Sequence, residues 1–182
     1  RPAGVVDELT GVLRADKLGP ALQKYVARHR KYDEDVAFLY IDVDSLDQYN
    51  RHYGRAAGDE ILRTVGRILE KSVREDDLIG RVENDEFMVA MGCSGRNALE
   101  AAKRISNEIK TAHVSHENSG LRVTVCIGIA AYPDDGVVAK QLFMRSETAL
   151  KGAKRRGRNM CMRFAPIMER RRAKKVVPKE TF

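Results

Sequence analysis

Two short apolar runs near the middle of the chain, residues 78–79 and 87–91, flank the acidic sequence E-N-D-E at residues 83–86. Short apolar runs on either side of a polar turn are typical of a β-hairpin. Asn84 suits the turn, because asparagine adopts positive φ more readily than most residues. Three carboxylates at a hairpin turn form either a solvated turn or half of a divalent-cation site, and the hairpin alone favours the solvated turn.

A third strand is predicted at residues 36–43, an apolar run that ends in Asp42-Val43-Asp44. Such a run is typical of a central strand that is buried on both faces. Alternation along a strand places Asp42 and Asp44 on the same face. The two carboxylates could therefore serve one site, or they could solvate the end of the strand.

Apolar residues at helical spacing predict four helices, and β-branched or apolar runs predict two more strands. The helices are expected around residues 18–26 with Asp16 as N-cap, around residues 61–69 after a polar loop at 47–58, at about 96–113 and at about 139–155. The strands are expected at residues 122–131 and, at a sheet edge, 160–164. The resulting order α-β-α-β-β-α-β-α-β predicts an α/β fold with a mixed central sheet flanked by helices.

The chain of 182 residues, 43% of them hydrophobic, is long enough for one well-cored domain. It contains no run of about 18 apolar residues that could span a membrane. Cys93, Cys126 and Cys161 form no C-x-x-C pair, which fits reduced cysteines in a cytoplasmic protein better than disulfides or zinc ligands. The first residue, Arg1, is not Met and begins no signal peptide, as expected of a fragment of a longer protein.

The net charge of +7 is concentrated at the C-terminal end, where residues 151–182 carry 12 Lys and Arg against 2 acidic residues. We therefore expect a domain at residues 1–165 and a basic tail or linker at residues 166–182. Few aromatic residues interleave this tail, so sequence-specific nucleic-acid recognition is not expected. An alternative is that the chain is a structural module whose basic tail binds nucleic acid or an anionic membrane.

Five dispersed motifs resemble those of the GGDEF family, which comprises diguanylate cyclases and their inactive relatives. They are D-E-L-T-G at residues 7–11, the block at 41–59 with D-V-D, Asn50, Gly54 and Gly58-Asp59, R-V-E-N-D-E-F at 81–87, T-V-C-I-G-I-A at 124–130, and A-L-K-G-A-K-R-R-G-R-N at 149–159. Their order and spacing resemble the family over about residues 6–164. The resemblance implies a single palm-like nucleotide cyclase domain, two copies of which face each other and join two GTP molecules into cyclic di-GMP.

The resemblance also implies a role for each residue that matches the family's active site. These are Asp42 and Asp85 as Mg²⁺ ligands, Asn50 and Asp59 as readers of the guanine edge, Glu86 as the group that assists the 3′-hydroxyl, and Lys154 and Arg158 as triphosphate ligands. Metal ions and basic side chains suit this reaction, because they activate the hydroxyl and neutralise the phosphoryl group. Lys154 and Arg158 could equally form a solvated helix end.

The sequence departs from the family pattern in the substrate site. Glu83 and Asn84 replace the two glycines of the signature, where a missing Cβ lets the nucleotide approach the backbone. Asp47 replaces the lysine of the F-K-x-x-N motif, which changes the charge by two units near the expected phosphates. Arg51 and Arg55 partly offset this change. We therefore expect little or no cyclase activity. Mg²⁺ is expected as a cofactor only if the GTP site is functional.

Residues 74–77, R-E-D-D, resemble a second site of the family, the R-x-x-D inhibitory motif, which lies five residues ahead of the signature. This motif binds intercalated dimers of cyclic di-GMP. Arginine can donate bidentate bonds to guanine or phosphate, and aspartate can accept from the guanine edge. Arg74 and Asp77 are therefore the expected ligands, Arg104 is a secondary candidate, and Arg81 is either a further ligand or a structural residue of the hairpin.

These patterns favour a degenerate GGDEF domain that acts as a cyclic di-GMP receptor. Ligand binding would crosslink two copies into a homodimer or dock this domain against an unknown upstream regulatory domain or partner. The enzyme alternative is a diguanylate cyclase of low turnover that its product inhibits through the R-x-x-D motif.

Overall fold

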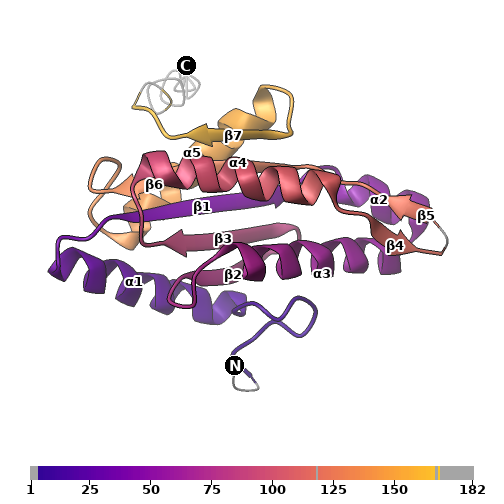
Figure 1. Cartoon of the computed structure of the whole chain (residues 1–182), viewed down its shortest axis with the longest axis horizontal. Helices are drawn as coiled ribbons and strands as arrows, with labels where there is room; N and C mark the ends of the chain where they lie inside the picture. The colour runs from indigo at the N-terminus through magenta and orange to yellow at the C-terminus, as the bar shows by residue number, and fades with distance from the viewer. Residues whose placement is uncertain (1–3, 118, 167, 169–182) are drawn as a thin grey trace, which may run out of the picture.

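The computed structural model describes residues 4–117, 119–166 and 168. Its centre is strand β1 (Val36–Val43), and every residue of this strand is buried, as the unbroken apolar run predicts. A five-stranded sheet forms around it in the order β2-β3-β1-β6-β7 (Figure 1). The other strands are β2 (Leu78–Glu83), β3 (Glu86–Met91), β6 (Val125–Tyr132) and β7 (Met160–Arg163). Strands β6 and β7 pair in parallel and the other neighbouring strands of this sheet pair antiparallel, so the sheet is mixed, as predicted.

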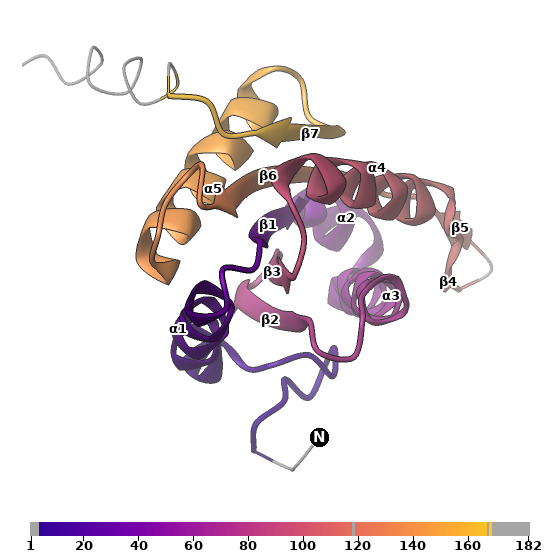
Figure 2. The ribbon, with the colours of Figure 1, turned by 60° about the vertical axis from the view of Figure 1, so that its left-hand side comes forward.

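Four helices cover the two faces of the sheet (Figure 2). Helices α3 (Arg55–Ser72) and α4 (Gly95–Thr111) cover one face, and α1 (Ala15–Lys31) and α5 (Ala139–Arg155) cover the other. Alternate residues of β1 divide between the faces, because Leu39 and Ile41 join the core under α3 and α4 while Phe38 and Tyr40 join the core under α1 and α5. Asp42 follows Tyr40 by two residues and therefore shares the α1/α5 face.

The predicted hairpin is present, with β2 and β3 paired antiparallel around the acidic turn. The register shifts between Arg81 and Glu83, so a bulge lies next to the turn. The closing strand β7 lies at the sheet edge beside β6, as predicted.

The prediction of a polar loop at residues 47–58 is wrong. Helix α2 (Leu46–Tyr53) occupies most of this segment, and α3 begins at Arg55 directly after Gly54, whose φ is +85°. Helix α2 buries only Leu46 of its residues, so its sequence lacks the apolar periodicity that predicts a helix. Asp16 is also not the N-cap of α1, since the helix begins after Arg14 and Asp16 lies in its first turn.

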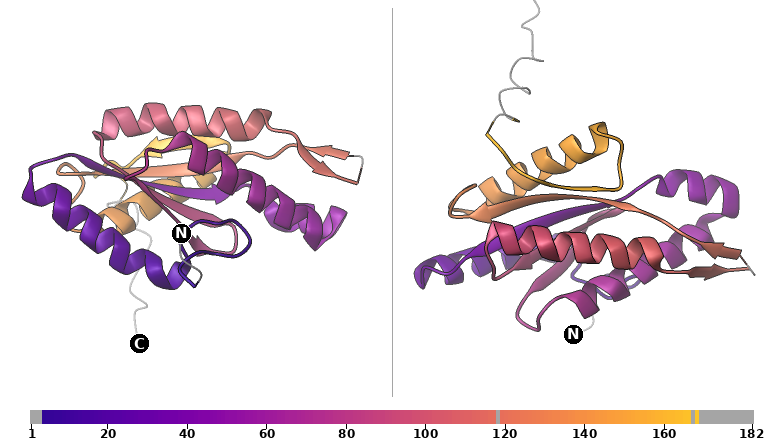
Figure 3. Two further views of the ribbon diagram at one scale, coloured as in Figure 1. Left: turned by 60° about the horizontal axis from the view of Figure 1, so that its bottom comes forward. Right: turned by 45° about the horizontal axis from the view of Figure 1, so that its top comes forward.

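A small second sheet was not predicted. Strands β4 (Val114–His116) and β5 (Ser119–Leu121) form a short hairpin that projects beyond the end of α4 (Figure 3). The strand expected from residue 122 begins instead at Val125. The hairpin strands are too short to show an alternating pattern in the sequence.

Among the described residues, no helix is both long and apolar enough to cross a lipid bilayer. The three cysteines form no disulfide bond. The basic tail at residues 166–182 lies outside the described residues except for Pro166 and Met168, so the boundary at residue 165 stays a prediction.

Candidate functional site

Three carboxylates meet where the end of β1 faces the hairpin turn. Ligand oxygens of Asp42, Asp85 and Glu86 lie within 4.8 Å of one another. The register of the sheet causes this meeting, because Asp42 on β1 pairs with Glu86 on β3 and paired residues share a face. Asp42 is buried and the other two are half-buried. Hard divalent cations such as Mg²⁺ bind through oxygen ligands, so this acidic cluster fits a metal site.

Lys154, in the last turn of α5, forms an ion pair with the buried carboxylate of Asp42. Burial raises the pKa of Asp42 to about 6, even though the hydrogen bond from Lys154 acts in the opposite direction. Burial alone would lower the pKa of Lys154, but the bond to Asp42 and the nearby acidic charges outweigh burial and raise it. The lysine is thus the positive partner of the acidic cluster in this structure.

Asp44 does not join the acidic cluster. Its carboxylate accepts hydrogen bonds from the Thr124 hydroxyl at 2.7 Å, the Cys126 thiol at 3.2 Å and the Asn159 backbone N–H at 2.9 Å. Arg158 lies 3.8 Å away as a weak ion pair. Asp44 therefore holds the loop after α5 against the strands, which fixes the position of Arg158.

The predicted guanine-reading residues line one cavity of about 430 Å³. Asn50 and Asp59 reach it from α2 and α3, and Gly58 and Asn84 also border it. The buried amide oxygen of Asn50 has no hydrogen-bond partner among the described residues. A Cβ at Gly58 would lie 1.8 Å from that oxygen, so the glycine makes room for it. A buried amide oxygen without a partner, beside a cavity, suits a ligand that donates a hydrogen bond.

The charge reversal at Asp47 is compensated locally. Arg51 donates to its carboxylate at 3.1 Å across one turn of α2, and both side chains are largely exposed. Arg55 also lines the cavity. The negative charge of Asp47 is therefore partly neutralised by its neighbour on α2.

The R-x-x-D residues form a separate cavity of about 330 Å³ at the start of β2, the opposite end of that strand from the turn. Arg74, Asp77 and Arg104 all line it. The buried carboxylate of Asp77 accepts hydrogen bonds from Tyr25 Oη at 3.2 Å, Gly92 N at 3.3 Å and Arg74 N at 2.9 Å. Asp77 thus fixes the backbone of the motif.

The two arginines of this cavity are available to a ligand. Arg74 is exposed, and its guanidinium forms no ion pair within the described part of the chain. Arg104 is exposed on α4, and its Nη2 donates a long bond of 3.4 Å to the Ser72 carbonyl. The cavity therefore presents two guanidinium groups to solvent, which suits an anion with hydrogen-bond acceptors.

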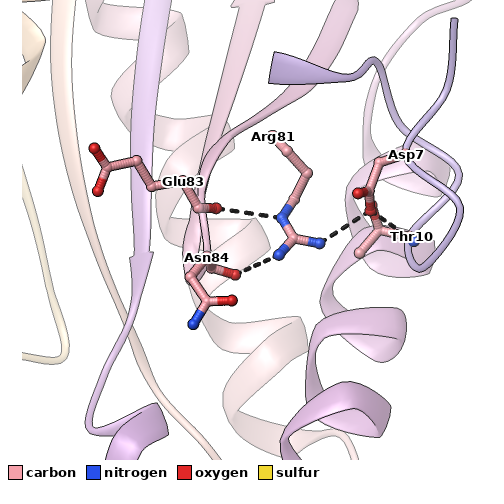
Figure 4. A network of polar contacts seen from close by, with 5 residues as sticks. All are labelled: Asp7, Thr10, Arg81, Glu83 and Asn84. Carbon is pink, nitrogen blue, oxygen red and sulfur yellow. Dashed lines mark hydrogen bonds and ion pairs between the residues drawn. The ribbon is translucent and has the colours of Figure 1, made fainter. Parts of the chain in front are cut away.

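Arg81 lies away from this cavity and holds the signature turn (Figure 4). It is almost fully buried, with Nη1 2.9 Å from Asp7 and its other nitrogens donating to the backbone carbonyls of Glu83 and Asn84. Asp7 in turn accepts from the backbone N–H and the hydroxyl of Thr10. Of its two expected roles, the structural one accounts for all of these contacts.

Residues 4–160 match the family model described as "Diguanylate cyclase, GGDEF domain". The chain belongs to the GGDEF family. Diguanylate cyclase A of Treponema denticola is 32% identical over 127 residues, covering 69% of this chain and 34% of the relative. The response regulator PleD of Caulobacter vibrioides is 32% identical over 158 residues, covering 85% of this chain and 35% of PleD. The chain thus spans about a third of the length of these two relatives.

Solved structures of other GGDEF domains share the fold. The GGDEF domain of YfiN (TpbB) from Pseudomonas aeruginosa superposes with a TM-score of 0.87 at 27% identity, covering 92% of this chain and 99% of that one. The GGDEF domain of DgcB from Caulobacter crescentus, solved in complex with c-di-GMP, has a TM-score of 0.82 at 18% identity, covering 90% and 97%. The predicted palm-like fold is therefore confirmed.

Sequence reasoning missed Tyr40, whose hydroxyl donates to Glu86 at 2.5 Å. Burial, followed by the hydrogen bond from this hydroxyl to Glu86, raises the pKa of Tyr40. The signal was present in the sequence, because Tyr40 precedes Asp42 by two residues and must share its face of the strand. In this GGDEF domain, Tyr40 therefore orients the glutamate of the signature.

Replacing Arg81 by alanine is expected to lower the free energy of unfolding by about 2–3 kcal/mol, because Asp7 and two turn carbonyls lose a buried, charged donor. Urea unfolding measures the change. Arg51→Ala is the matched control, since its ion pair with Asp47 is exposed and is expected to contribute less than about 1 kcal/mol. Equal losses in the two variants would contradict the structural role of Arg81.

The stability contribution of Asp42 is expected to fall as the pH rises from about 4 to about 6. Its pKa is raised from 3.8 to about 6 in the folded protein, so the folded state binds this proton more tightly than the unfolded state. This contribution, on the order of 3 kcal/mol, is fully present below the pKa of the unfolded state and is lost as the pH rises through the pKa of the folded state. Urea unfolding of wild type and Asp42→Asn at several pH values measures it. A difference between the two proteins that stays constant with pH would contradict this expectation.

Proposed function

We propose that this GGDEF domain is a receptor for cyclic di-GMP that binds the dinucleotide at the cavity of Arg74, Asp77 and Arg104, with little or no diguanylate cyclase activity. The observation that carries the proposal is the pair of exposed guanidinium groups on one cavity, next to a carboxylate that fixes the motif backbone. The same fold holds c-di-GMP in the DgcB structure, which supports the proposal at the level of the fold.

The chemistry of cyclic di-GMP fits this arrangement. Each guanine offers the acceptors O6 and N7, and each phosphate is an anion, so both groups suit the planar donors of Arg74 and Arg104. Asp77 already accepts three hydrogen bonds, and a carboxylate offers about four acceptor sites. One site therefore remains for a guanine N–H, while the other three hold the loop in position.

Weak or absent turnover follows from the substituted substrate site. Glu83 and Asn84 place side chains at the turn, and Glu83 adds a negative charge where a tetraanionic nucleotide would lie. Lys154, which would hold the triphosphate, is paired with Asp42 instead. A nucleotide would have to compete with this ion pair for the lysine.

Isothermal titration of cyclic di-GMP, and separately of GTP with Mg²⁺, tests the proposal. Micromolar binding of cyclic di-GMP together with no binding of GTP is the expected result. No affinity for cyclic di-GMP at high micromolar concentration would overturn the receptor function. Light scattering during the titration would also show whether the ligand crosslinks two copies into a homodimer, as we propose for this cytoplasmic signalling domain.

The second candidate is a weakly active diguanylate cyclase that its product inhibits. The compact acidic cluster of Asp42, Asp85 and Glu86 favours it, because these residues fit the two Mg²⁺ ligands and the hydroxyl-assisting group of an active site. Bound Mg²⁺ would stabilise charge on the phosphoryl group in transfer. Incubation with GTP and Mg²⁺ followed by chromatography decides between the candidates. Cyclic di-GMP made by wild type and lost in Glu86→Gln would establish the enzyme.

A further inference from the structure

A third cavity, about 500 Å³ in volume, lies between α2, the last turn of α4 and the segment that leads into β6. Helix α2, the end of α4 and β5 gather at the right of Figure 1. Within the described part of the chain, this cavity shares no lining residue with the two cavities above. Its volume is in the range of pockets that bind small molecules.

One wall of this cavity is aromatic and held in place. Tyr49 and Tyr53, one turn apart on α2, are stacked with ring centroids 6.3 Å apart and an interplanar angle of 25°. The Tyr49 hydroxyl donates to the backbone carbonyl of Arg122, which ties the helix to the opposite wall. Tyr53 is 45% exposed. Tyr53, which packs on the anchored Tyr49, thus presents an exposed aromatic ring on which another flat ring can stack.

The other wall is positively charged. Lys110 and Arg122 are both exposed, and neither forms an ion pair with a carboxylate among residues 4–117, 119–166 and 168. Asp44 also lines the cavity, but it is buried and accepts hydrogen bonds from Thr124, Cys126 and Asn159. Arg158 lies 3.8 Å from this carboxylate and partly offsets its charge. Arg122 Nη2 lies 3.1 Å from His113 Nε2, a contact that leaves the positive charge of the guanidinium in place. Lys110 and Arg122 therefore give this wall of the cavity its positive charge.

We propose that this cavity binds a small planar aromatic anion, such as an aryl phosphate or aryl carboxylate, with its ring against Tyr53 and its anionic group toward Lys110 and Arg122. Stacking and charge act together here. A neutral aromatic ligand would leave Lys110 and Arg122 without a partner, and an anion without a ring would not contact Tyr53. The proposal is independent of cyclic di-GMP binding at Arg74.

Fluorescence anisotropy of 1-naphthyl phosphate, titrated with the full chain, tests the proposal. Saturable binding is expected, and Lys110→Gln/Arg122→Gln should weaken it about tenfold or more. Tyr53→Ala should weaken it severalfold. The matched control is Lys24→Gln/Arg28→Gln on α1, which removes the same two charges from exposed positions outside the cavity and should leave the affinity unchanged.

The proposal would be contradicted by no saturable binding to wild type at millimolar protein or by equal weakening in the α1 control. Weakening by Asn50→Ala would also contradict it, because it would place the probe in the nucleotide cavity. Neutral 1-naphthol should bind at least about tenfold more weakly, and equal binding would show that the charges play no part. Cyclic di-GMP titrated into the Lys110→Gln/Arg122→Gln and Tyr53→Ala variants should bind as to wild type, which separates this site from the one at Arg74.

Discussion

Arg74→Ala is expected to lower the affinity of this GGDEF domain for cyclic di-GMP by roughly a hundredfold, because it removes a bidentate, charge-assisted donor to guanine or phosphate. The variant should fold normally. Arg74 is exposed, and the bond to Asp77 comes from its backbone N–H, which alanine retains. Isothermal titration of both proteins under the same salt conditions measures the loss.

Two further variants give the Arg74 experiment its controls. Arg104→Ala removes the second guanidinium of the cavity and is expected to cost less, about three- to tenfold, because Arg104 also contacts the Ser72 carbonyl. Arg96→Ala removes an exposed arginine of the same helix that does not line the cavity, so the affinity should not change. Binding that survives Arg74→Ala unchanged would mean that the ligand occupies another site.

Gly128→Ala is expected to lower the free energy of unfolding by about 4 kcal/mol or to prevent folding. Gly128 lies in β6 at the point where α5 crosses the sheet, and the backbones of the helix and the strand approach each other closely there. A Cβ there would lie 2.1 Å from the Ser146 carbonyl oxygen and 2.3 Å from the Leu150 backbone nitrogen. Both atoms belong to the backbone of α5, so a rotamer change cannot relieve the clash. Urea unfolding followed by circular dichroism measures the loss.

Gly19→Ala is the matched control for this prediction. Gly19 lies within α1, and a Cβ at this position would meet no atom within 4 Å. The same substitution is expected to change the free energy of unfolding by less than about 1 kcal/mol, because the smaller loss of backbone entropy of alanine in a helix is opposed by the clash between its Cβ and the ring of Pro20. A loss below about 1 kcal/mol in Gly128→Ala would show that α5 does not approach β6 this closely.

Much of the fold could be predicted because its elements have strong local patterns. The continuous apolar run of β1 predicts a buried central strand, and the apolar runs around E-N-D-E predict the hairpin. Helix α2 could not be predicted in this way, since it buries only Leu46. Its position depends on contacts with α3 and with the segment before β6, and tertiary contacts of this kind leave little trace in local periodicity.

The sequence also predicted which residues belong to the candidate sites, but it did not predict which groups each of these residues contacts. Motif spacing pointed to Asp42, Asp85 and Glu86, and the register of β1 with β3 brings them together. Motif spacing also pointed to Arg81 as a candidate ligand, whereas its partner Asp7 shows that it holds the turn. The sequence pattern alone left those two roles open.

By itself, then, the sequence determined the family, the sheet at the centre of the fold and the motif that carries Arg74. These depend on residue types and spacings within short segments, where periodicity and turn chemistry act locally. Only the tertiary structure decided that Lys154 pairs with Asp42, that Asp77 anchors the backbone of Arg74, and that Tyr53 faces a cationic cavity. Ion pairs and cavities depend on distances of a few ångströms between groups, often from segments far apart in the chain, and those distances exist only after the sheet and its helices have packed together.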